Sequence, residues 1–171
     1  MARFYYLLTI FSDEEIANKC VSHFNQKELS LASGMVLKCK TNILKTNSNL
    51  YCIFIEPDGV SVTSKSSPII KDSSQLDEIA YHLYESLKNI SGFSCAIAGW
   101  EVADMFIPDV HGGYEDMLIL PNEFDVSNME WWNGLVISED LWESINKNSL
   151  YESFCAGYVW RPYKTLSISG W

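Results

Sequence analysis

Residues 35–56, MVLKCKTNILKTNSNLYCIFIE, decide the fold class because they hold two strand-like runs around a short polar turn. Valine, isoleucine, threonine, tyrosine and phenylalanine, which favour strands, recur in the runs Met35–Leu44 and Leu50–Glu56. The intervening Lys45–Asn49 is polar and suits a hairpin turn. Two strands joined in this way pair antiparallel, so the sequence predicts an antiparallel hairpin.

Two amphipathic helices are predicted, one on each side of this hairpin in the sequence. The first follows a buried strand at Phe4–Phe11, and Ser12 with Glu15 three residues later matches a capping box. Its apolar stripe consists of Ile16, Ala17, Cys20, Val21 and Phe24. Ser73 or Ser74 is expected to cap the second helix. The stripe of this helix consists of Leu76, Ile79, Ala80, Leu83, Tyr84 and Leu87.

The remaining chain predicts further short strands and one short helix. Pro57–Gly59 forms a tight turn into a strand at Val60–Thr63. Ser138 is expected to cap a brief helix whose Leu141, Trp142 and Ile145 share one face. Other strands are expected at Ser94–Val102, Met117–Leu120, Gly134–Ile137 and Gly157–Lys164, the last an edge or final strand interrupted at Pro162.

The order of these elements predicts an α+β fold. Strands come in runs with hairpin-length links, which favours a largely antiparallel or mixed sheet with two main helices and one short helix. The chain has 171 residues, of which 47% are hydrophobic, and no linker or repeat divides it. We therefore expect one domain spanning residues 1–171, with a core that needs no metal or disulfide.

The cysteines and the N-terminal sequence predict the compartment. Five cysteines, an odd number, are widely spaced beside apolar residues, so we expect reduced thiols and a cytoplasmic protein. The apolar run Phe4–Phe11 is followed by Ser12–Glu15 instead of small residues, which argues against a signal peptide. No apolar run approaches the roughly 18 residues that a membrane-spanning helix needs.

Charge is distributed unevenly along the chain. The 22 acids and 12 bases give a formal net charge of -10. Residues 89–146, here called the acidic window, contain eleven acids and no Lys or Arg. The rest of the chain carries eleven acids and all twelve bases, a balance of +1. All of the net negative charge therefore comes from about one third of the sequence.

The acidic window predicts a binding surface for a basic protein. A field of one sign costs self-repulsion and suits the steering of an oppositely charged partner, whereas an ordinary solvated surface mixes both signs. Four of the six tryptophans also lie in the window, and tryptophans near carboxylates resemble the anchors of tight interfaces. The expected partner-binding residues are Asp104, Asp109, Glu115, Asp116, Glu123, Asp125, Glu130, Trp131 and Trp132. A solvated acidic loop without a partner is the alternative.

Other ligand classes have little support. Direct nucleic-acid binding needs clusters of Lys and Arg, which the sequence lacks. Glu115 and Asp116 alone do not form a calcium-binding motif, so no metal is expected. Phosphate-binding glycine motifs are also absent, and no cofactor is expected. The sequence leaves the oligomeric state open.

One stretch resembles a catalytic site. His111 lies near carboxylates in Asp109–Asp116, beside the glycine pair at positions 112 and 113, but an ordinary glycine loop explains the same residues. Cys155, His111 and Asp109 could in principle form a catalytic triad with Cys155 as the nucleophile. The apolar neighbours of Cys155 argue against this, because they are typical of a buried thiol. We expect no catalytic residues, and a small hydrolase-like enzyme using the His111 loop is an alternative.

The segregated acids and tryptophans between Glu101 and Glu143, in a small reduced α+β chain without a catalytic motif, resemble bacterial immunity proteins. These are antidotes that neutralise the toxin domains of colicins and of contact-dependent or secretion-system-delivered toxins. The resemblance implies a stoichiometric inhibitor that covers the active site of a basic toxin domain, such as a nuclease. A phage-encoded inhibitor that imitates the charge of DNA would have similar statistics and stays open as an alternative.

Overall fold

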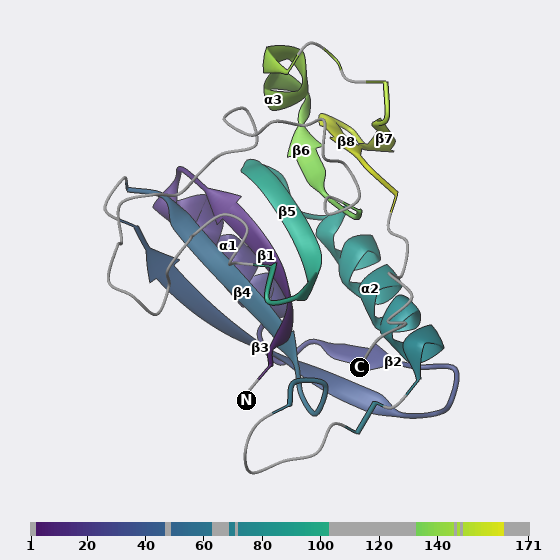
Figure 1. Cartoon of the computed structure of the whole chain (residues 1–171). Coiled ribbons are helices and arrows are strands. Elements are labelled where there is room, and N and C mark those ends of the chain that lie inside the picture. The colour runs from purple at the N-terminus through teal and green to yellow at the C-terminus, as the bar shows by residue number, and fades with distance from the viewer. Residues whose placement is uncertain are drawn as a thin grey trace.

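The computed structural model describes residues 3–46, 49–62, 69–70, 72–102, 133–145, 147 and 149–162. These residues form one eight-stranded antiparallel sheet and three helices (Figure 1). The strands are β1 (Tyr5–Phe11), β2 (Glu28–Ser30), β3 (Val36–Lys45), β4 (Tyr51–Pro57), β5 (Phe93–Trp100), β6 (Val136–Ser138), β7 (Glu152–Cys155) and β8 (Tyr158–Trp160). The helices are α1 (Glu14–Phe24), α2 (Ser73–Leu87) and α3 (Glu139–Ser144). The predicted α+β class, with two main helices and one short one, is confirmed.

Strand β1 lies in the middle of the sheet, whose order is β2-β3-β4-β1-β5-β6-β8-β7. It pairs antiparallel with β4 and β5, and all seven of its residues are buried. Because side chains alternate along a strand, Tyr5 and Leu7 join the core beneath α1 and α2, whereas Leu8 and Ile10 join a second cluster on the opposite face. The short helix α3 packs on this second cluster. The middle of the sheet, at β1, is therefore buried on both faces.

Helix α1 forms as expected, but its cap differs from the prediction. The N-cap is Asp13, whose carboxylate accepts a hydrogen bond from the Ile16 amide at 2.9 Å. The expected cap, Ser12, is wrong by one residue, because the carboxylate that reaches the third amide of the helix belongs to Asp13. The interior half of the predicted stripe, Ala17, Cys20 and Phe24, is fully buried.

The cap of helix α2 also differs from the prediction, and lies one or two residues earlier than expected. Asp72, and not Ser73 or Ser74, is the N-cap, and its carboxylate accepts hydrogen bonds from the amide and the hydroxyl of Ser74. All six predicted stripe residues are buried in the core. Near the end of α2, the buried hydroxyl of Tyr84 accepts from the Ala98 amide at 2.9 Å and donates to the Gly134 carbonyl at 2.8 Å. This hydroxyl joins α2 to β5 and to the segment that leads into β6.

The predicted hairpin is present as β3 and β4, paired from Cys39 with Pro57 to Lys45 with Tyr51. A third short strand, β2, extends this unit and was not predicted, because three residues give too short a pattern. The expected strand at Val60–Thr63 is wrong for the residues that the structure describes there. Val60 belongs to the turn after β4, and Val62 makes an isolated bridge with Arg3.

The C-terminal part of the sheet agrees with most of the predictions. Strands β5, β6 and β8 form within or close to their expected ranges. Ser138 caps α3, with its hydroxyl accepting from the Leu141 amide at 3.3 Å, as expected. Strand β7 was missed because its four residues show no clear alternation. The expected strand at Met117–Leu120 lies outside the described residues.

All five cysteines are free thiols, four of them buried and Cys155 half-buried. This agrees with the expectation of reduced core or near-core thiols. Across the described part of the chain, no helix combines the length and the apolar character that crossing a bilayer demands.

Candidate functional site

The nine residues predicted to bind a partner, from Asp104 to Trp132, all lie outside the described residues. The structure therefore neither brings them together nor separates them. It does describe four acids of the acidic window, Glu101, Glu139, Asp140 and Glu143, and two of its tryptophans, Trp100 and Trp142. These six residues are the described part of the candidate site.

Helix α3 presents three of the four acids. Glu139 and Asp140 lie in its first turn, where carboxylates are favoured by the positive end of the helix dipole. Both side chains are exposed and form no ion pair within the described part of the chain. Glu143, one turn later, pairs with Lys147 at 3.0 Å. Glu139 and Asp140 are thus the uncompensated charges of this helix.

The opposite face of α3 fixes its position. Leu141, Trp142 and Ile145 pack against the second core cluster, as their spacing predicted. The Lys147 ammonium lies 5.9 Å from the centroid of the Trp142 ring. An apolar face that is held against the sheet keeps the acidic face of α3 directed outward.

Glu101 has a structural role that the sequence did not reveal. Its carboxylate accepts a hydrogen bond from the Phe4 amide at 2.7 Å, and its own amide donates to the Phe4 carbonyl at 2.9 Å. Its φ of 52° is left-handed, which a non-glycine residue adopts only where other contacts hold it. Glu101 therefore joins the end of β5 to the start of β1, and its charge is committed to that contact.

The two described tryptophans are both half-buried. Trp100 packs edge to face on Tyr5, with 5.4 Å between ring centroids, and its indole N–H is buried without a hydrogen-bond partner. Trp142 packs on the core as described above. Their packing is that of boundary residues, and the anchors expected at Trp131 and Trp132 lie outside the described residues.

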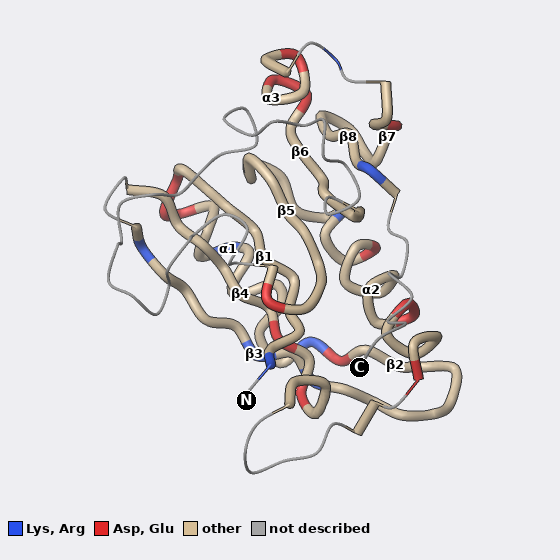
Figure 2. Tube along the Cα trace, in the orientation of Figure 1, with Lys and Arg blue, Asp and Glu red and all other residues tan. Residues whose placement is uncertain are grey.

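Figure 2 shows acidic positions on α3 and basic positions near β2 and β3, with charges of the opposite sign close to both groups. Residues 25–45, which include β2 and β3, carry four lysines and one glutamate, a balance of +3. Residues 133–162, which include β6, α3, β7 and β8, carry four acids and two bases, a balance of -2. Strands β3 and β8 are separated by β4, β1, β5 and β6, so these two groups lie apart in the sheet, and the ion pair of Lys40 with Asp58 at 2.5 Å offsets part of the positive balance.

Comparison with known proteins identifies no relative. No family model, no curated protein and no solved structure matches this chain. The chemistry of the described residues is therefore the basis for a function.

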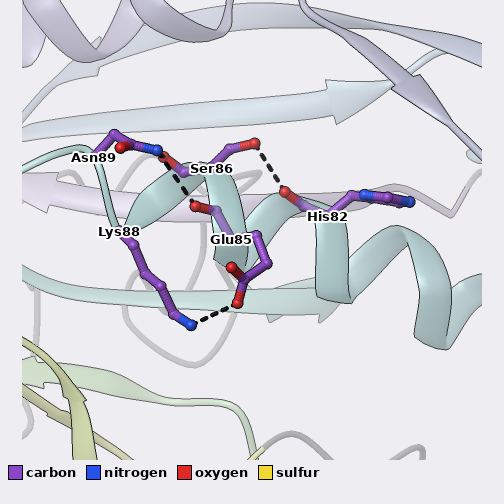
Figure 3. Close-up of polar contacts among 5 residues, drawn as sticks. All are labelled: His82, Glu85, Ser86, Lys88 and Asn89. Carbon is purple, nitrogen blue, oxygen red and sulfur yellow. Dashed lines mark hydrogen bonds and ion pairs between the residues drawn. The ribbon is translucent and has the colours of Figure 1, made fainter.

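A polar cluster lies at the end of α2 (Figure 3). The Lys88 ammonium pairs with the Glu85 carboxylate at 2.5 Å, and the Ser86 hydroxyl donates to the His82 carbonyl at 2.8 Å. The Asn89 amide reaches the Glu85 carbonyl at 3.5 Å. The Ser86 and Asn89 side chains thus bond to carbonyl groups of the last turns, and Lys88 pairs with a side chain of the same helix, so these contacts stabilise the C-terminal end of α2.

The catalytic alternative is only partly visible. His111 and Asp109 lie outside the described residues, whereas Cys155 lies on β7, half-buried and near Lys88. Burial raises the pKa of Cys155, and the charge of Lys88 opposes that rise without cancelling it. The thiol is therefore protonated near neutral pH, which disfavours nucleophilic attack by this residue as it stands.

Clustered His, Cys, Asp and Glu side chains are the usual ligands of metal ions in proteins. Within the described ranges, no three His, Cys, Asp or Glu side chains come together in a way that could hold a metal ion. The His82 imidazole lies 3.8 Å from the half-buried Glu78 carboxylate one turn earlier on α2, and this carboxylate also accepts a hydrogen bond from the Ala32 amide at 2.6 Å. Burial beside Lys27 lowers the pKa of His23, so this imidazole is neutral at pH 7.

Proposed function

We propose that this chain is a stoichiometric binding protein that neutralises a basic partner, and that the partner is a toxin domain for which the chain serves as the immunity protein. The observation that carries the proposal is the acidic window, with eleven acids and no Lys or Arg in residues 89–146. The nine predicted partner-binding residues belong to this window.

The described part of the window supports a role in steering. Glu139 and Asp140 are exposed on α3, at the end of the sheet that carries the negative balance. Unpaired charges of one sign on a fixed element attract a basic partner over about one Debye length, roughly 10 Å at 0.1 M salt. Glu139 and Asp140 are the described charges that would meet this partner, because Lys38 and Lys40 at the other end of the sheet pair with Glu28 and Asp58.

An enzyme that uses the His111 loop is the competing proposal. It expects turnover and loss of activity when His111 is replaced. The binding proposal expects His111→Ala and Cys155→Ser to protect against the toxin as well as the wild type does, with unchanged melting curves. Loss of protection in either folded variant would favour the enzyme.

The decisive experiment begins with capture of the partner. The full chain is used as bait in a lysate of its source organism at low and high salt, and captured proteins are tested for toxicity and for neutralisation by added bait. Association kinetics with the purified partner are then compared for wild type and for Glu115→Lys/Asp116→Lys. We expect slower association with a flatter dependence on ionic strength, and a smaller change in dissociation.

A matched pair of charge reversals tests the described surface. Glu139→Lys/Asp140→Lys reverses two first-turn acids of α3, and Glu14→Lys/Glu15→Lys reverses two first-turn acids of α1, outside the window. Both changes add the same charge at a helix N-terminus. The α1 pair also removes the Tyr51–Glu14 hydrogen bond at 2.9 Å and the Glu15–Lys19 ion pair at 2.7 Å, so melting curves must show that both variants are folded. The α3 pair should slow association more than the α1 pair. Equal effects would show that only net charge matters and would contradict a directed acidic surface.

A further inference from the structure

The outer edge of β3 is only partly covered. Strand β2 pairs with β3 from Val36 to Lys38, and two more backbone hydrogen bonds join Gln26 and Lys27 to Cys39. Beyond Cys39, no strand in the described part of the chain lies on this side of β3 (Figure 1). Among the described residues, 41–45 are therefore an uncovered edge of the sheet, next to the part of β3 that β2 covers.

The hydrogen-bond pattern shows which residues face outward. The Asp58 amide donates to the Lys38 carbonyl at one end of the β3–β4 ladder, and the Thr46 amide donates to the Leu50 carbonyl at the other. Even-numbered residues of β3 thus direct their backbone groups toward β4. Cys39, an odd-numbered residue, bonds outward. By the same alternation, Thr41, Ile43 and Lys45 direct their N–H and C=O groups away from the sheet.

Apolar side chains are exposed along this edge. Ile43 is 48% exposed and Leu44 is 40% exposed, one on each face of the strand. Open backbone groups beside exposed apolar side chains form a template for pairing with another strand. Another strand could therefore bond to the outward backbone groups of this edge and cover its exposed apolar side chains.

The charges beside the edge are already compensated within the chain. Lys38 pairs with Glu28 at 3.7 Å, and Lys40 pairs with Asp58 at 2.5 Å. The Lys45 ammonium lies 5.2 Å from the centroid of the Tyr51 ring. An acidic peptide would find few free cations here, which favours an added strand that matches apolar side chains and backbone groups.

We propose that this edge pairs with the same edge of a second copy of the chain, antiparallel and centred on Ile43. This is the one symmetric register that joins all three outward residues, since Ile43 meets Ile43 and Thr41 meets Lys45 in both directions. It forms six backbone hydrogen bonds. A register centred on Thr41 would need Cys39, whose backbone groups are already bonded to Lys27 and Gln26.

The register also avoids like charges directly opposite each other. Lys45 faces Thr41 on one side of the strands, and Leu44 faces Asn42 on the other. Ile43 becomes covered by Ile43 of the second copy, and Leu44 by Asn42 of the second copy. The dimer extends the two sheets into one and leaves the acidic end at α3 outside the interface, so it is independent of the proposed function.

Sedimentation velocity over a series of concentrations tests the dimer. The paired edge is shorter than standard interfaces, so we expect weak association, visible as a rise from 19.5 kDa toward twice that mass between about 10 and 500 μM. Ile43→Lys places two ammonium groups opposite each other and should weaken dimerisation at least tenfold. Val36→Lys is the matched control, since this residue is equally exposed but lies where β2 already pairs.

Amide hydrogen exchange provides a second readout. The amides of Thr41, Ile43 and Lys45 should exchange at least about twofold more slowly at the high concentration, whereas those of Asn42 and Leu44, already bonded to β4, should not change. If Ile43→Lys fails to fold, Thr41→Pro serves instead, because it removes one outward N–H and no bond to β4.

Three results would overturn the proposal. One is a wild-type chain that stays monomeric up to 500 μM, which would leave the edge to a strand of another protein. Another is growth beyond the dimer, which would indicate head-to-tail pairing. The third is equal weakening by Ile43→Lys and Val36→Lys, because the effect would then come from added charge and not from the edge.

Discussion

Replacing Tyr84 by Phe removes one hydroxyl from the joint between α2, β5 and the segment before β6. The side chain is 3% exposed, and its hydroxyl serves two backbone groups, the Ala98 amide and the Gly134 carbonyl. Leaving a buried donor or acceptor unsatisfied costs about 1–3 kcal/mol, so the two together should cost about 2–6 kcal/mol. The ring keeps its edge contacts with Phe154 and Trp160, so no cavity adds to this cost.

Denaturant unfolding followed by tryptophan fluorescence measures this loss, with Tyr81→Phe as the control. Tyr81 lies on the same helix but is 60% exposed, so losing its hydroxyl should change the free energy of unfolding by less than about 0.5 kcal/mol. A loss for Tyr84→Phe below about 1 kcal/mol, or one equal to that of Tyr81→Phe, would refute the role assigned to this hydroxyl. An unchanged slope with denaturant would show that the difference lies in stability.

Three further predictions concern caps and thiols. Asp13→Ala should cost about 1 kcal/mol of unfolding free energy by thermal melting, whereas Ser12→Ala should cost little, and the reverse order would restore Ser12 as the cap. Hydrogen bonds from Ser74 lower the pKa of Asp72 in the folded protein, so the ionised carboxylate stabilises the fold above the unfolded-state pKa, and this stabilisation is lost as pH falls through the folded-state pKa. The difference in unfolding midpoint between wild type and Asp72→Ala should therefore narrow in acid. A difference that stays constant with pH would contradict the charged cap. A thiol reagent at pH 7.5 should modify Cys155 first and spare residues such as Cys52, whose pKa burial raises to about 12; rapid modification of all five cysteines in the folded protein would contradict the described core.

The sequence predicted the larger elements because their patterns are long. The stripe of α2 repeats over four turns, and all six of its members are buried. The caps were displaced by one residue because Ser and Asp stand side by side at both helix starts, and either side chain can accept from a helical amide. Which of the two residues becomes the N-cap depends on the path of the chain before the helix, and residue propensities do not specify that path.

The functional surfaces were harder to predict. Glu101 was counted only as one of the eleven acids of the acidic window. Its left-handed φ and its bonds to Phe4 depend on the pairing of β5 with β1, a contact between residues far apart in the sequence. The open edge of β3 did leave a signal. Ile43 and Leu44 are adjacent apolar residues in a strand that otherwise alternates, so their side chains must point to opposite faces of the sheet. Both are exposed because this end of β3 is covered on neither face.

The acidic surface on α3 and the open edge of β3 lie at opposite ends of one sheet, so partner binding and dimerisation can occur in the same molecule and do not depend on each other. In the dimer, the edges at β3 meet on the two-fold axis, so both α3 ends point outward and each can meet a basic partner. The complex should then hold two chains and two partners at high concentration, and one of each after Ile43→Lys. Because the outward charges do not take part in the edge, Glu139→Lys/Asp140→Lys should slow partner association while leaving the dimer unchanged. A reversal on α3 that also dissolved the dimer would show that the two ends communicate, and the separation of binding and self-association argued from the strand order would be wrong.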